Sequence, residues 1–394
     1  MTQTNPFALY THIPFCTAKC TYCDFNSYAG QDSLMAPYAQ AVAKEASLWS
    51  GHLEGRRAET VFFGGGTPSL LPLAEMQVIV GALRERFEIA PEAEITLEAN
   101  PGTVDAAHLA GLRRLGFNRI SFGVQSFHDD ELRTLERIYD ADEVGQAYAW
   151  ARDAGFENIN LDLIYGLAGQ TLEGWRVNLE RALSMAPEHL SLYALTLEDG
   201  TPLTRDVNRG RSLGPDLDLQ ADMFEWTVGR MERSGYLHYE VSNWARPGRE
   251  CQHNLFYWRN GDWLGLGAGA HSHLLEQRFA GAASPSRYIA LIGESEISEG
   301  DPLENMRQIG MREAADPARE MSETAFLALR LREGLDIAAF ESRFGVDFER
   351  VFGEALRETR SLGLTEVRDG RLRLRDEAIL LGDEAFIRFL TPAT

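Results

Sequence analysis

Three cysteines stand close together near the start of the chain, at Cys16, Cys20 and Cys23. They follow a C-x3-C-x2-C spacing, and the chain has four cysteines in all, the last being Cys251. Clustered thiolates are typical ligands of iron–sulfur clusters, and a [4Fe–4S] cube is normally held by four of them. Three local thiolates would leave one iron of such a cube open to an outside ligand. The spacing therefore predicts a [4Fe–4S] cluster with an open iron.

Two other uses of these cysteines have to be weighed. A structural zinc ion would need a fourth ligand, which Asp24 or His12 could supply. A disulfide is disfavoured because three clustered cysteines leave one unpaired. The N-terminal segment Met1–Pro6 also lacks the basic stretch and long apolar run of a secretion signal. We favour the cluster, and zinc stays open on spacing alone.

A repeated strand, loop and helix pattern follows the first half of the chain. The strand-like runs are Ala8–Phe15, Thr60–Gly64, Glu94–Asn100, Arg119–Ser126, Asn158–Leu167 and His189–Thr196. The helix-like segments between them are Met35–Trp49, Leu73–Phe87, Asp105–Leu115, Asp142–Ala154 and Leu172–Met185. Alternating strands and helices predict parallel pairing with right-handed crossovers. We expect an α/β fold built on an incomplete (β/α)6 barrel, with a doubly wound sheet as the alternative.

Three of the predicted strands carry polar residues on one face only. These residues are Thr96, Glu98, Asn100, Ser121, Gln125, Asn160 and Asp162. Strands of a parallel sheet that is buried on both faces usually read as continuous apolar runs. Burying the charged Glu98 and Asp162 is costly without a ligand or a partner. The pattern therefore indicates a polar barrel interior that binds something, although buried groups that satisfy one another would give the same pattern.

The second half of the chain has a different character. Thr201–Pro215 is irregular, a helix is expected at Asp216–Ser234 and a strand at Tyr236–Trp244, and a Gly- and His-rich stretch runs to His273. The last part suggests helices at Glu323–Arg332, Ile337–Phe344 and Phe348–Leu362, a hairpin turning at Asp369-Gly370, and a helix at Glu377–Leu390. That order is winged-helix-like. We expect a barrel over residues 1–200, an α+β extension over 201–319 and the winged-helix-like domain over 320–394.

Composition and charge exclude several classes of protein. The formal net charge of −21 argues against general nucleic-acid binding. Acidic residues also outnumber arginines in the winged-helix-like part, which favours protein packing or a lid over DNA binding there. No segment approaches the uninterrupted apolar length of a membrane span. We therefore expect a cytoplasmic protein without an integral membrane segment.

Several further segments share a pattern with the cysteine motif. They are Tyr10–Cys16 (YTHIPFC), Gly64–Pro68 (GGGTP), Leu97–Pro101 (LEANP), Ser121–Ser126 (SFGVQS) and Asn160–Gly166 (NLDLIYG). The glycines at the end of the second strand would let the backbone approach a ligand closely. Together these segments resemble the coproporphyrinogen III oxidase branch of the radical S-adenosylmethionine (SAM) superfamily. That branch holds the oxygen-independent oxidase HemN and the related haem chaperone HemW, and the resemblance covers nearly the whole chain.

The resemblance implies a cofactor set and the residues that hold it. Cys16, Cys20 and Cys23 would bind the [4Fe–4S] cluster. The SAM site would be lined by Tyr10, Tyr22, Gly65, Gly66, Thr67, Glu98, Gln125, Arg137 and Asp162. The carboxylates could accept hydrogen bonds from the ammonium group or the ribose of SAM, and Arg137 could pair with its carboxylate. The family usually has Leu-Gly-Arg-x-His around Arg137, whereas this chain reads L-E-R-I-Y over Leu135–Tyr139, so the local backbone and polarity differ.

Two features resemble the chaperone rather than the oxidase. Phe25 stands where the oxidase pattern continues to a fourth cysteine, and the chain lacks the oxidase's longer N-terminal extension. The segment His253–Trp258 (HNLFYW) matches the H-N-x-x-Y-W element typical of the haem chaperone. His253 could bind haem iron beside a flat aromatic wall, and Cys251 is an alternative ligand. A histidine with a purely structural role would give the same sequence pattern. His271 and His273 are weaker candidates for the haem ligand.

We therefore expect a radical-SAM-type haem chaperone, which binds haem, a [4Fe–4S] cluster and SAM and transfers haem to acceptor apoproteins such as respiratory enzymes. The alternative is the oxygen-independent coproporphyrinogen III oxidase of porphyrin biosynthesis, which would use a 5′-deoxyadenosyl radical. Phe25 argues against that enzyme activity. The sequence leaves open whether SAM is cleaved, and a homodimer is one assembly compatible with it.

Overall fold

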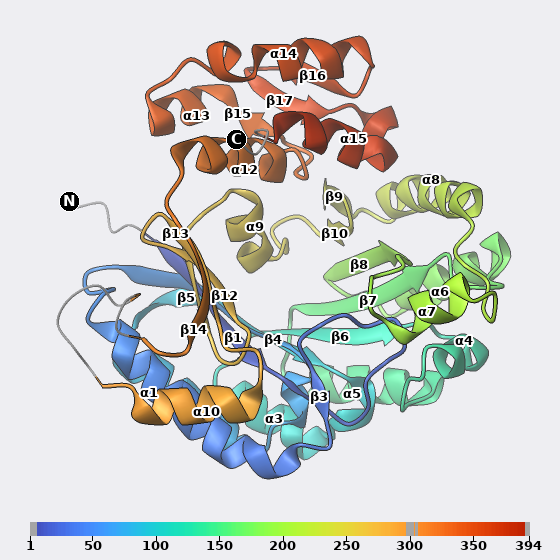
Figure 1. Cartoon of the computed structure of the whole chain (residues 1–394). Coiled ribbons are helices and arrows are strands. Elements are labelled where there is room, and N and C mark those ends of the chain that lie inside the picture. The colour runs from blue at the N-terminus through green and yellow to red at the C-terminus, as the bar shows by residue number, and fades with distance from the viewer. Residues whose placement is uncertain (1–5, 297–302, 304–305, 391–394) are drawn as a thin grey trace. The chain divides into compact units, whose positions relative to one another are not determined.

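The computed structural model describes residues 6–296, 303 and 306–390 (Figure 1). Most of the N-terminal segment Met1–Pro6 therefore lies outside the described residues. The chain forms two compact units, Met1–Glu225 with Asp262–Glu313, and Trp226–Gly261 with Ala314–Thr394. These units are not the three segments expected from the sequence, and the three-part division stays a prediction about domain organisation.

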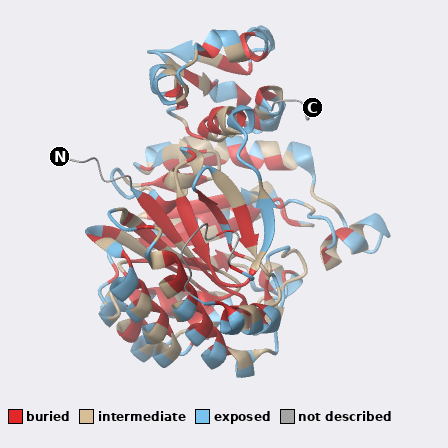
Figure 2. Cartoon of the chain, turned by 60° about the vertical axis from the view of Figure 1, so that its left-hand side comes forward, coloured by how far each residue is buried: buried red, intermediate tan, exposed pale blue. Residues whose placement is uncertain are grey.

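Six parallel strands form the centre of the first unit. In spatial order they are β1 (Phe7–Ile13), β4 (Arg57–Gly65), β5 (Glu88–Ala99), β6 (Arg119–Gln125), β7 (Ile159–Tyr165) and β8 (His189–Ala194). Each neighbouring pair is parallel, and the order in space follows the order in sequence. Four of these strands are mostly buried, β4 and β5 also have half-buried or exposed positions, and the helices expose their outward faces (Figure 2). The predicted incomplete (β/α)6 barrel is confirmed.

A helix follows each of the first five strands before the chain enters the next. These helices are α1 (Met35–Ser50), α2 (Leu73–Arg86), α3 (Ala106–Arg114), α5 (Ala141–Asp153) and α6 (Leu172–Ser184), and they lie within a residue or two of the predicted bounds. Side chains of Asp105, Asp140 and Thr171 cap three of the helix starts by accepting backbone N–H bonds. A short helix, α4 (Asp129–Thr134), was not predicted.

The sheet continues beyond β1 with strands from the Gly- and His-rich stretch. The first of them, β11 (Trp263–Leu266), pairs with β1 in parallel, and β12 (His271–Leu274), β13 (Gln277–Gly281) and β14 (Ile309–Glu313) follow antiparallel. The helix α10 (Pro285–Glu294) packs beside α1. A further helix, α7 (Pro202–Asn208), occupies part of the segment that was expected to be irregular. β1 is therefore an internal strand with a partner on each side.

The second unit begins within α8 (Leu217–Arg233), and an antiparallel pair of strands follows that helix. β9 (Leu237–Glu240) and β10 (Asn243–Ala245) stand where one continuous strand was expected, so that expectation was wrong. The carboxylate of Glu240 is the physical reason. It accepts from the Ser242 amide at 3.0 Å and from the Asn243 side chain, which stabilises a turn. The short helix α9 (Gln252–Trp258) follows.

The C-terminal part of this unit has the expected winged-helix-like order. Its helices are α12 (Pro317–Ala328), α13 (Ile337–Phe344) and α14 (Phe348–Ser361), and its small sheet has the order β15 (Leu335–Asp336), β17 (Arg371–Leu374), β16 (Thr365–Arg368). The hairpin turns at Asp369 and Gly370, which both have positive φ, as a two-residue turn requires. The predicted last helix is instead three short pieces, η4 (Asp376–Leu381), α15 (Gly382–Phe386) and η5 (Ile387–Phe389).

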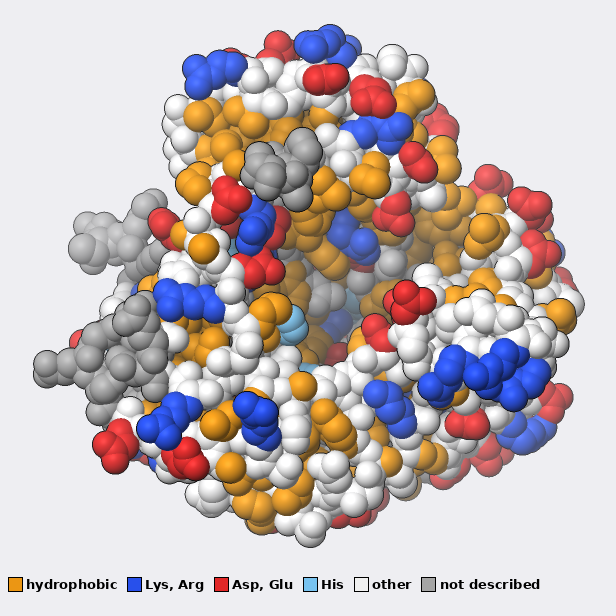
Figure 3. Space-filling view, viewed as in Figure 1, with side chains coloured by type: hydrophobic (Ala, Val, Ile, Leu, Met, Phe, Trp, Pro, Cys, Tyr) orange, Lys and Arg blue, Asp and Glu red, His pale blue; other side chains and the backbone are white. Residues whose placement is uncertain are grey.

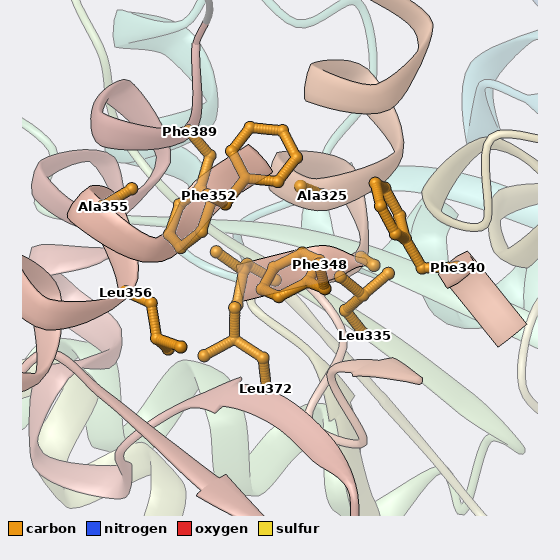
Figure 4. Packing of buried hydrophobic residues seen from close by; sticks show 11 residues of the cluster. Ala325, Leu335, Phe340, Phe348, Phe352, Ala355, Leu356, Leu372 and Phe389 are labelled. Atoms are coloured by element: carbon orange, nitrogen blue, oxygen red, sulfur yellow. The ribbon is translucent and has the colours of Figure 1, made fainter. Parts of the chain in front are cut away.

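An aromatic cluster holds these C-terminal elements together (Figure 4). The ring of Phe340 lies 5.1 Å from that of Phe348 and 6.0 Å from that of Phe352, both edge to face. Phe389, from the last 3₁₀ turn, closes the cluster at 5.6 Å from Phe352. Such offset aromatic pairs add stability beyond the apolar area that they bury.

Among the described residues, no helix is both long and apolar enough to cross a membrane.

Candidate functional site

The three motif cysteines lie on one loop of the first unit. Cys16 ends β2 (Phe15–Cys16), which pairs in parallel with β3 (Tyr28–Ala29) and so closes the base of the loop. Cys16 is buried, Cys20 and Cys23 are half-buried, and none of the three is in a disulfide. The Cys23 amide donates to the carbonyl of Cys20 at 3.2 Å. The loop therefore presents its three thiols from a compact turn.

The side chain of His12 fastens the cysteine loop to the barrel. One ring nitrogen is 2.9 Å from the Tyr10 hydroxyl, and the other is 2.9 Å from the Asn26 carbonyl. The Asn26 amide in turn donates to the carbonyls of Ala268 and Ala283, both at 3.0 Å. Both nitrogens of His12 are thus used within the protein. This arrangement argues against His12 as the fourth ligand of a zinc ion.

A single-ion site and a cluster site make different demands on the thiols. Within the part of the chain that the structure describes, no group of three or more His, Cys, Asp or Glu side chains is arranged to hold one metal ion. Zinc needs its ligands to converge on one point. In a [4Fe–4S] cube each thiolate binds a different iron, so the sulfurs need not converge.

Two hydrogen-bond donors point at sulfurs of the motif. The Thr67 hydroxyl lies 3.5 Å from the sulfur of Cys16, and the Arg137 Nη1 lies 3.3 Å from the sulfur of Cys20. A neighbouring cation or donor favours the thiolate, which is the form that binds iron. Burial acts the other way on Cys23 and raises the pKa of its thiol. The donor set fits a thiolate-bound cluster, and the assignment of the three ligands stays a prediction.

The glycine run at the end of β4 is required by packing. Gly65 has φ +114°, and a Cβ there would lie 2.5 Å from the His12 ring. A Cβ on Gly66 would lie 2.7 Å from the Phe15 carbonyl oxygen. The Gly66 amide also donates to the Ile13 carbonyl at 2.9 Å. Glycine is therefore needed to bring this strand end against β1, and the predicted SAM contact of Gly65, Gly66 and Thr67 would be an additional role.

The polar faces of three strands meet inside the barrel, as the sequence predicts. Glu98 stands opposite Ser121 across β5 and β6, and Ser121 stands opposite Asn160 across β6 and β7. The carboxylate of Asp162 accepts from Ser121 Oγ at 3.1 Å and from Asn160 Nδ2 at 2.7 Å. Asn160 Oδ1 is 2.6 Å from Nδ1 of the buried His189. Part of this network therefore satisfies itself.

Glu98 is one of the interior residues whose hydrogen bonding is incomplete, together with Thr96 and Asn100. Among the described residues its carboxylate accepts one bond, from the Gly65 amide at 3.1 Å. Burial raises the pKa of Glu98 to about 8, and the nearby charge of Asp162 adds to the rise. Burial also raises the pKa of Asp162, against the effect of its hydrogen bonds. Two carboxyls that resist ionisation together suit a cationic ligand, because the ligand would stabilise their charged forms.

Arg137 lies beside the cysteine loop and uses each side-chain nitrogen on a protein group. Nε donates to the Tyr139 hydroxyl at 2.7 Å, and Nη2 donates to the Gly123 carbonyl at 2.8 Å. Nη1 reaches the Cys20 sulfur and, at 3.4 Å, the Tyr22 hydroxyl. The predicted pairing of Arg137 with the SAM carboxylate stays a prediction. What the structure adds is a contact with a predicted cluster ligand.

The remaining predicted SAM residues also lie in the first unit. Tyr10 stacks on Phe62 with 6.3 Å between ring centroids. Tyr22 packs against a small apolar cluster that includes Leu135. Gln125 has φ +65° at a bulge of β6, an uncommon conformation for a residue with a side chain. In the space-filling view, histidine, basic and acidic side chains lie at the bottom of a hollow in this unit (Figure 3).

The departure from the family pattern around Arg137 has a structural meaning. Glu136 has φ +55°, the left-handed region that favours glycine, and glycine is what the family pattern has there. Tyr139, which stands in place of the family histidine, is buried and bonds to Arg137. Sequence reasoning did not assign a role to Tyr139, and the only signal was the altered motif L-E-R-I-Y.

The haem-linked element lies in the second unit, on α9. His253 is 1% exposed, and one ring nitrogen, Nε2, is 2.8 Å from the Tyr257 hydroxyl one helical turn later. The two rings meet edge to face at 4.8 Å. Trp258 is half-buried under the guanidinium of Arg330, and Cys251 is buried at the start of the helix. Iron ligation through Nε2 would require the Tyr257 hydroxyl to move, and the structural role of His253 stays open.

Family models match two parts of the chain. Residues 10–182 match the radical SAM superfamily, and residues 315–381 match the HemN C-terminal domain. The solved structure of coproporphyrinogen III oxidase (HemN) from Escherichia coli, described as a radical SAM enzyme, is similar with a TM-score of 0.84 and 26% identity. That similarity covers 99% of this chain and 91% of the oxidase.

Bacterial proteins named haem chaperone HemW are similar along most of their length. The Mycobacterium tuberculosis H37Rv protein is 36% identical over 389 residues, which cover 98% of this chain and 95% of the relative. The Bacillus subtilis protein is 34% identical over 97% of this chain and 98% of the relative. The Escherichia coli K12 protein is 44% identical over 69% of this chain and 71% of the relative.

Proposed function

Because the chain belongs to the HemW family of the radical SAM superfamily, we propose that it is a haem chaperone, which binds haem and passes it to proteins that need it. The observation that carries the proposal is the similarity to a relative of that name over 98% of this chain. Respiratory enzymes are the acceptors that we propose, and the cytoplasm is the proposed location.

The cysteine loop and the barrel interior would serve as the cofactor site of this chaperone. Cys16, Cys20 and Cys23 would hold a [4Fe–4S] cluster, which when bound supplies the electron that reduces SAM. The donors on Thr67 and Arg137 would stabilise two of the thiolates. Glu98 and Asp162 would then face the ammonium group or the ribose of SAM. The incomplete hydrogen bonding of Glu98 supports this use of the interior.

His253 is the proposed ligand of the transferred haem. A neutral imidazole is a common axial ligand of haem iron, and Phe256, Tyr257 and Trp258 follow it on the same short helix. The hydrogen bond between His253 Nε2 and the Tyr257 hydroxyl would hold the imidazole in place before haem arrives. Binding would replace one hydrogen bond with an iron–nitrogen bond. Cys251 is the alternative ligand within this element.

A second candidate function is the oxygen-independent coproporphyrinogen III oxidase. It is favoured by the likeness to the solved oxidase over 99% of this chain. Against it stands Phe25, which occupies the place of the oxidase's fourth motif cysteine and is 59% exposed. The two candidates separate in an assay of coproporphyrinogen decarboxylation with SAM and a strong reductant. Sustained turnover would replace the chaperone proposal with the enzyme.

Haem titration of the anaerobically reconstituted protein tests the chaperone proposal. The visible spectrum is followed for the wild type and for His253→Ala. We expect a saturable Soret band in the wild type and a roughly tenfold or greater loss of affinity in the variant, because an axial ligand is removed. His273→Ala is a matched control, since His273 is also buried and lies edge to face on a tryptophan, Trp263. It should bind haem like the wild type.

Two further variants separate the cofactors from haem. Cys20→Ser should lose the cluster's visible absorbance and most of its iron while it keeps the Soret titration. Cys251→Ser should keep both signals if His253 is the ligand. An unchanged Soret titration in His253→Ala together with a lost one in Cys251→Ser would move the ligand to Cys251. Absence of saturable haem binding in the wild type would overturn the chaperone proposal.

A further inference from the structure

Tyr139 contacts the Nε side of the Arg137 guanidinium, whereas Cys20 of the cysteine loop contacts Nη1. Its hydroxyl accepts from Arg137 Nε at 2.7 Å and contacts the carbonyl oxygens of Gly123 and Val124, the latter at 3.0 Å. The guanidinium carbon also lies 5.0 Å from the centre of the Tyr139 ring. The hydroxyl can donate to one of the two carbonyls while it accepts from Arg137. The tyrosine therefore ties the arginine to the end of β6.

The other end of the same guanidinium reaches the motif. Nη1 donates to the Cys20 sulfur at 3.3 Å and to the Tyr22 hydroxyl at 3.4 Å, while Nη2 holds the Gly123 carbonyl at 2.8 Å. Because a guanidinium is planar and rigid, fixing Nε fixes the direction of both Nη atoms. The contact on Cys20 thus depends on two anchors of the guanidinium, the Gly123 carbonyl on Nη2 and the Tyr139 side chain on Nε.

A positive charge and an N–H donor at a ligand sulfur have a known physical effect. Hydrogen bonds to the sulfurs and the local charge help to set the reduction potential of an iron–sulfur cluster. A donor on a thiolate stabilises the more negative, reduced cluster and so raises the potential. Residues that orient such groups without touching the metal commonly tune a site in this way.

We propose that Tyr139 is a positioning residue that holds Arg137 against Cys20 and thereby raises the reduction potential of the bound cluster. The proposal rests on the proposed cofactor site and goes beyond it, because it assigns a role to a residue outside that site. The proposal also gives a reason for Tyr139 to stand where the family pattern has a histidine. A tyrosine hydroxyl supplies the acceptor for Nε and is itself anchored on β6.

The chain contains a matched pair that lies away from the cysteines. Arg152 Nε donates to the Tyr148 hydroxyl at 3.1 Å, and that hydroxyl donates to the Met185 carbonyl at 2.7 Å. The guanidinium carbon of Arg152 lies 4.9 Å from the centre of the Tyr148 ring. The local chemistry is similar and both tyrosines are buried, although Arg152 Nη2 also donates to the Tyr148 hydroxyl at 2.6 Å and pairs with Glu188. Tyr148→Phe is therefore a control for the loss of a buried tyrosine–arginine bond as such.

The first measurement uses cluster-free protein and compares hydrogen exchange in Tyr139→Phe and Tyr148→Phe. Loss of a hydrogen bond to a charged group shifts a local opening equilibrium by roughly tenfold or more. We expect exchange in residues 16–24 and 119–125 to rise by about that factor in Tyr139→Phe alone. Equal protection of these segments in the wild type and Tyr139→Phe would overturn the positioning role.

The second measurement is the midpoint potential of the reconstituted cluster, followed by its electron paramagnetic resonance signal. Tyr139→Phe should shift the potential to a lower value, and Tyr148→Phe should leave it unchanged. A purely structural tyrosine would change stability in both variants and the potential in neither, which would overturn the tuning role. If the wild type assembles no cluster, the proposed cofactor site fails together with the tuning role, and hydrogen exchange still decides the positioning role.

Discussion

Two glutamates of the first unit, one buried and one half-buried, have the same chemistry and different surroundings. Glu45 lies on α1 and is 4% exposed. Its carboxylate accepts from the Tyr288 hydroxyl at 2.6 Å, the Gly267 amide at 2.8 Å and the Gln308 side chain at 3.2 Å. Glu98, in the barrel interior, accepts from the Gly65 amide alone among the described residues. One acid is saturated with donors, and the other keeps acceptor capacity.

The pKa values of these two acids do not tell their roles apart. Burial raises the pKa of Glu45 to about 7 and that of Glu98 to about 8. The hydrogen bonds on Glu45 partly oppose the effect of burial, whereas the charge of Asp162 adds to it for Glu98. A buried acid with a shifted pKa is thus a poor guide to a site by itself. The count of donors around it is the better guide.

The largest expected effect is on folding, from Glu45→Ala. This change leaves the Gly267 amide, the Tyr288 hydroxyl and the Gln308 side chain without their acceptor. Each unsatisfied buried group costs about 1–3 kcal/mol, so the free energy of unfolding should fall by about 3 kcal/mol or more. Urea unfolding of the cluster-free protein measures it. Glu85→Ala is the control, because Glu85 is exposed and makes only a surface ion pair, and a loss as small as this control's would show that Glu45 is not structural.

The next effect is on ligand binding, from Glu98→Gln. The amide keeps an oxygen for the Gly65 amide but loses the charge that would face the ammonium group of SAM. We expect the dissociation constant for SAM to rise by roughly tenfold or more, whereas the free energy of unfolding without ligand should not fall, because the neutral amide removes the cost of ionising this acid. Equilibrium dialysis with labelled SAM on reconstituted protein measures this. Glu45→Gln is the control, and it should change the free energy of unfolding while it leaves the dissociation constant for SAM unchanged. Identical SAM affinity in the wild type and Glu98→Gln would remove Glu98 from the proposed site.

The smallest effect is the change in stability between pH 7 and pH 8, measured without ligand. Both acids have a folded pKa above the ordinary value of 4.5. The folded chain then holds protons on these two acids that the unfolded chain has released, so their contribution to the free energy of unfolding falls as pH rises from about 4.5 to about 8. Above pH 7 the remaining fall should come mainly from Glu98. Glu98→Gln should flatten the curve between pH 7 and 8, and a curve there as steep as that of the wild type would contradict the raised pKa.

Much of the barrel was predictable because its signals are local. Each parallel strand is a run bounded by loop residues, each helix has an apolar face, and three of the helices begin at a capping residue such as Asp140. The polar faces of β5, β6 and β7 were predicted to meet, and bonds among Ser121, Asn160 and Asp162 confirm that they do. The alternation of polar and apolar residues along a strand shows which side chains share a face of the sheet, whichever strand is its partner.

The features that were missed depend on distant parts of the chain. The strands β11 to β14 have four or five residues each, and the first two lie in or at the end of the Gly- and His-rich stretch, so no clear period distinguishes them from loops. The anchoring of the cysteine loop by Asn26 on the Ala268 and Ala283 carbonyls joins residues far apart in sequence. Contacts of this kind leave no local pattern. The role of Tyr139 belongs to the same group, because it appears only once Arg137 and Cys20 are placed.

The parallel partner of β1 has a consequence for synthesis of the chain. The apolar strand Phe7–Ile13 is made among the first residues, while its neighbour Trp263–Leu266 emerges only after both α8 and α9. At roughly 5–20 residues per second, one edge of β1 stays unpaired for on the order of ten seconds or longer on the ribosome. An open apolar edge invites pairing with other chains. A nascent or truncated chain that stops before Trp263 would therefore need shielding, and the first half of the sequence is not a self-sufficient folding unit.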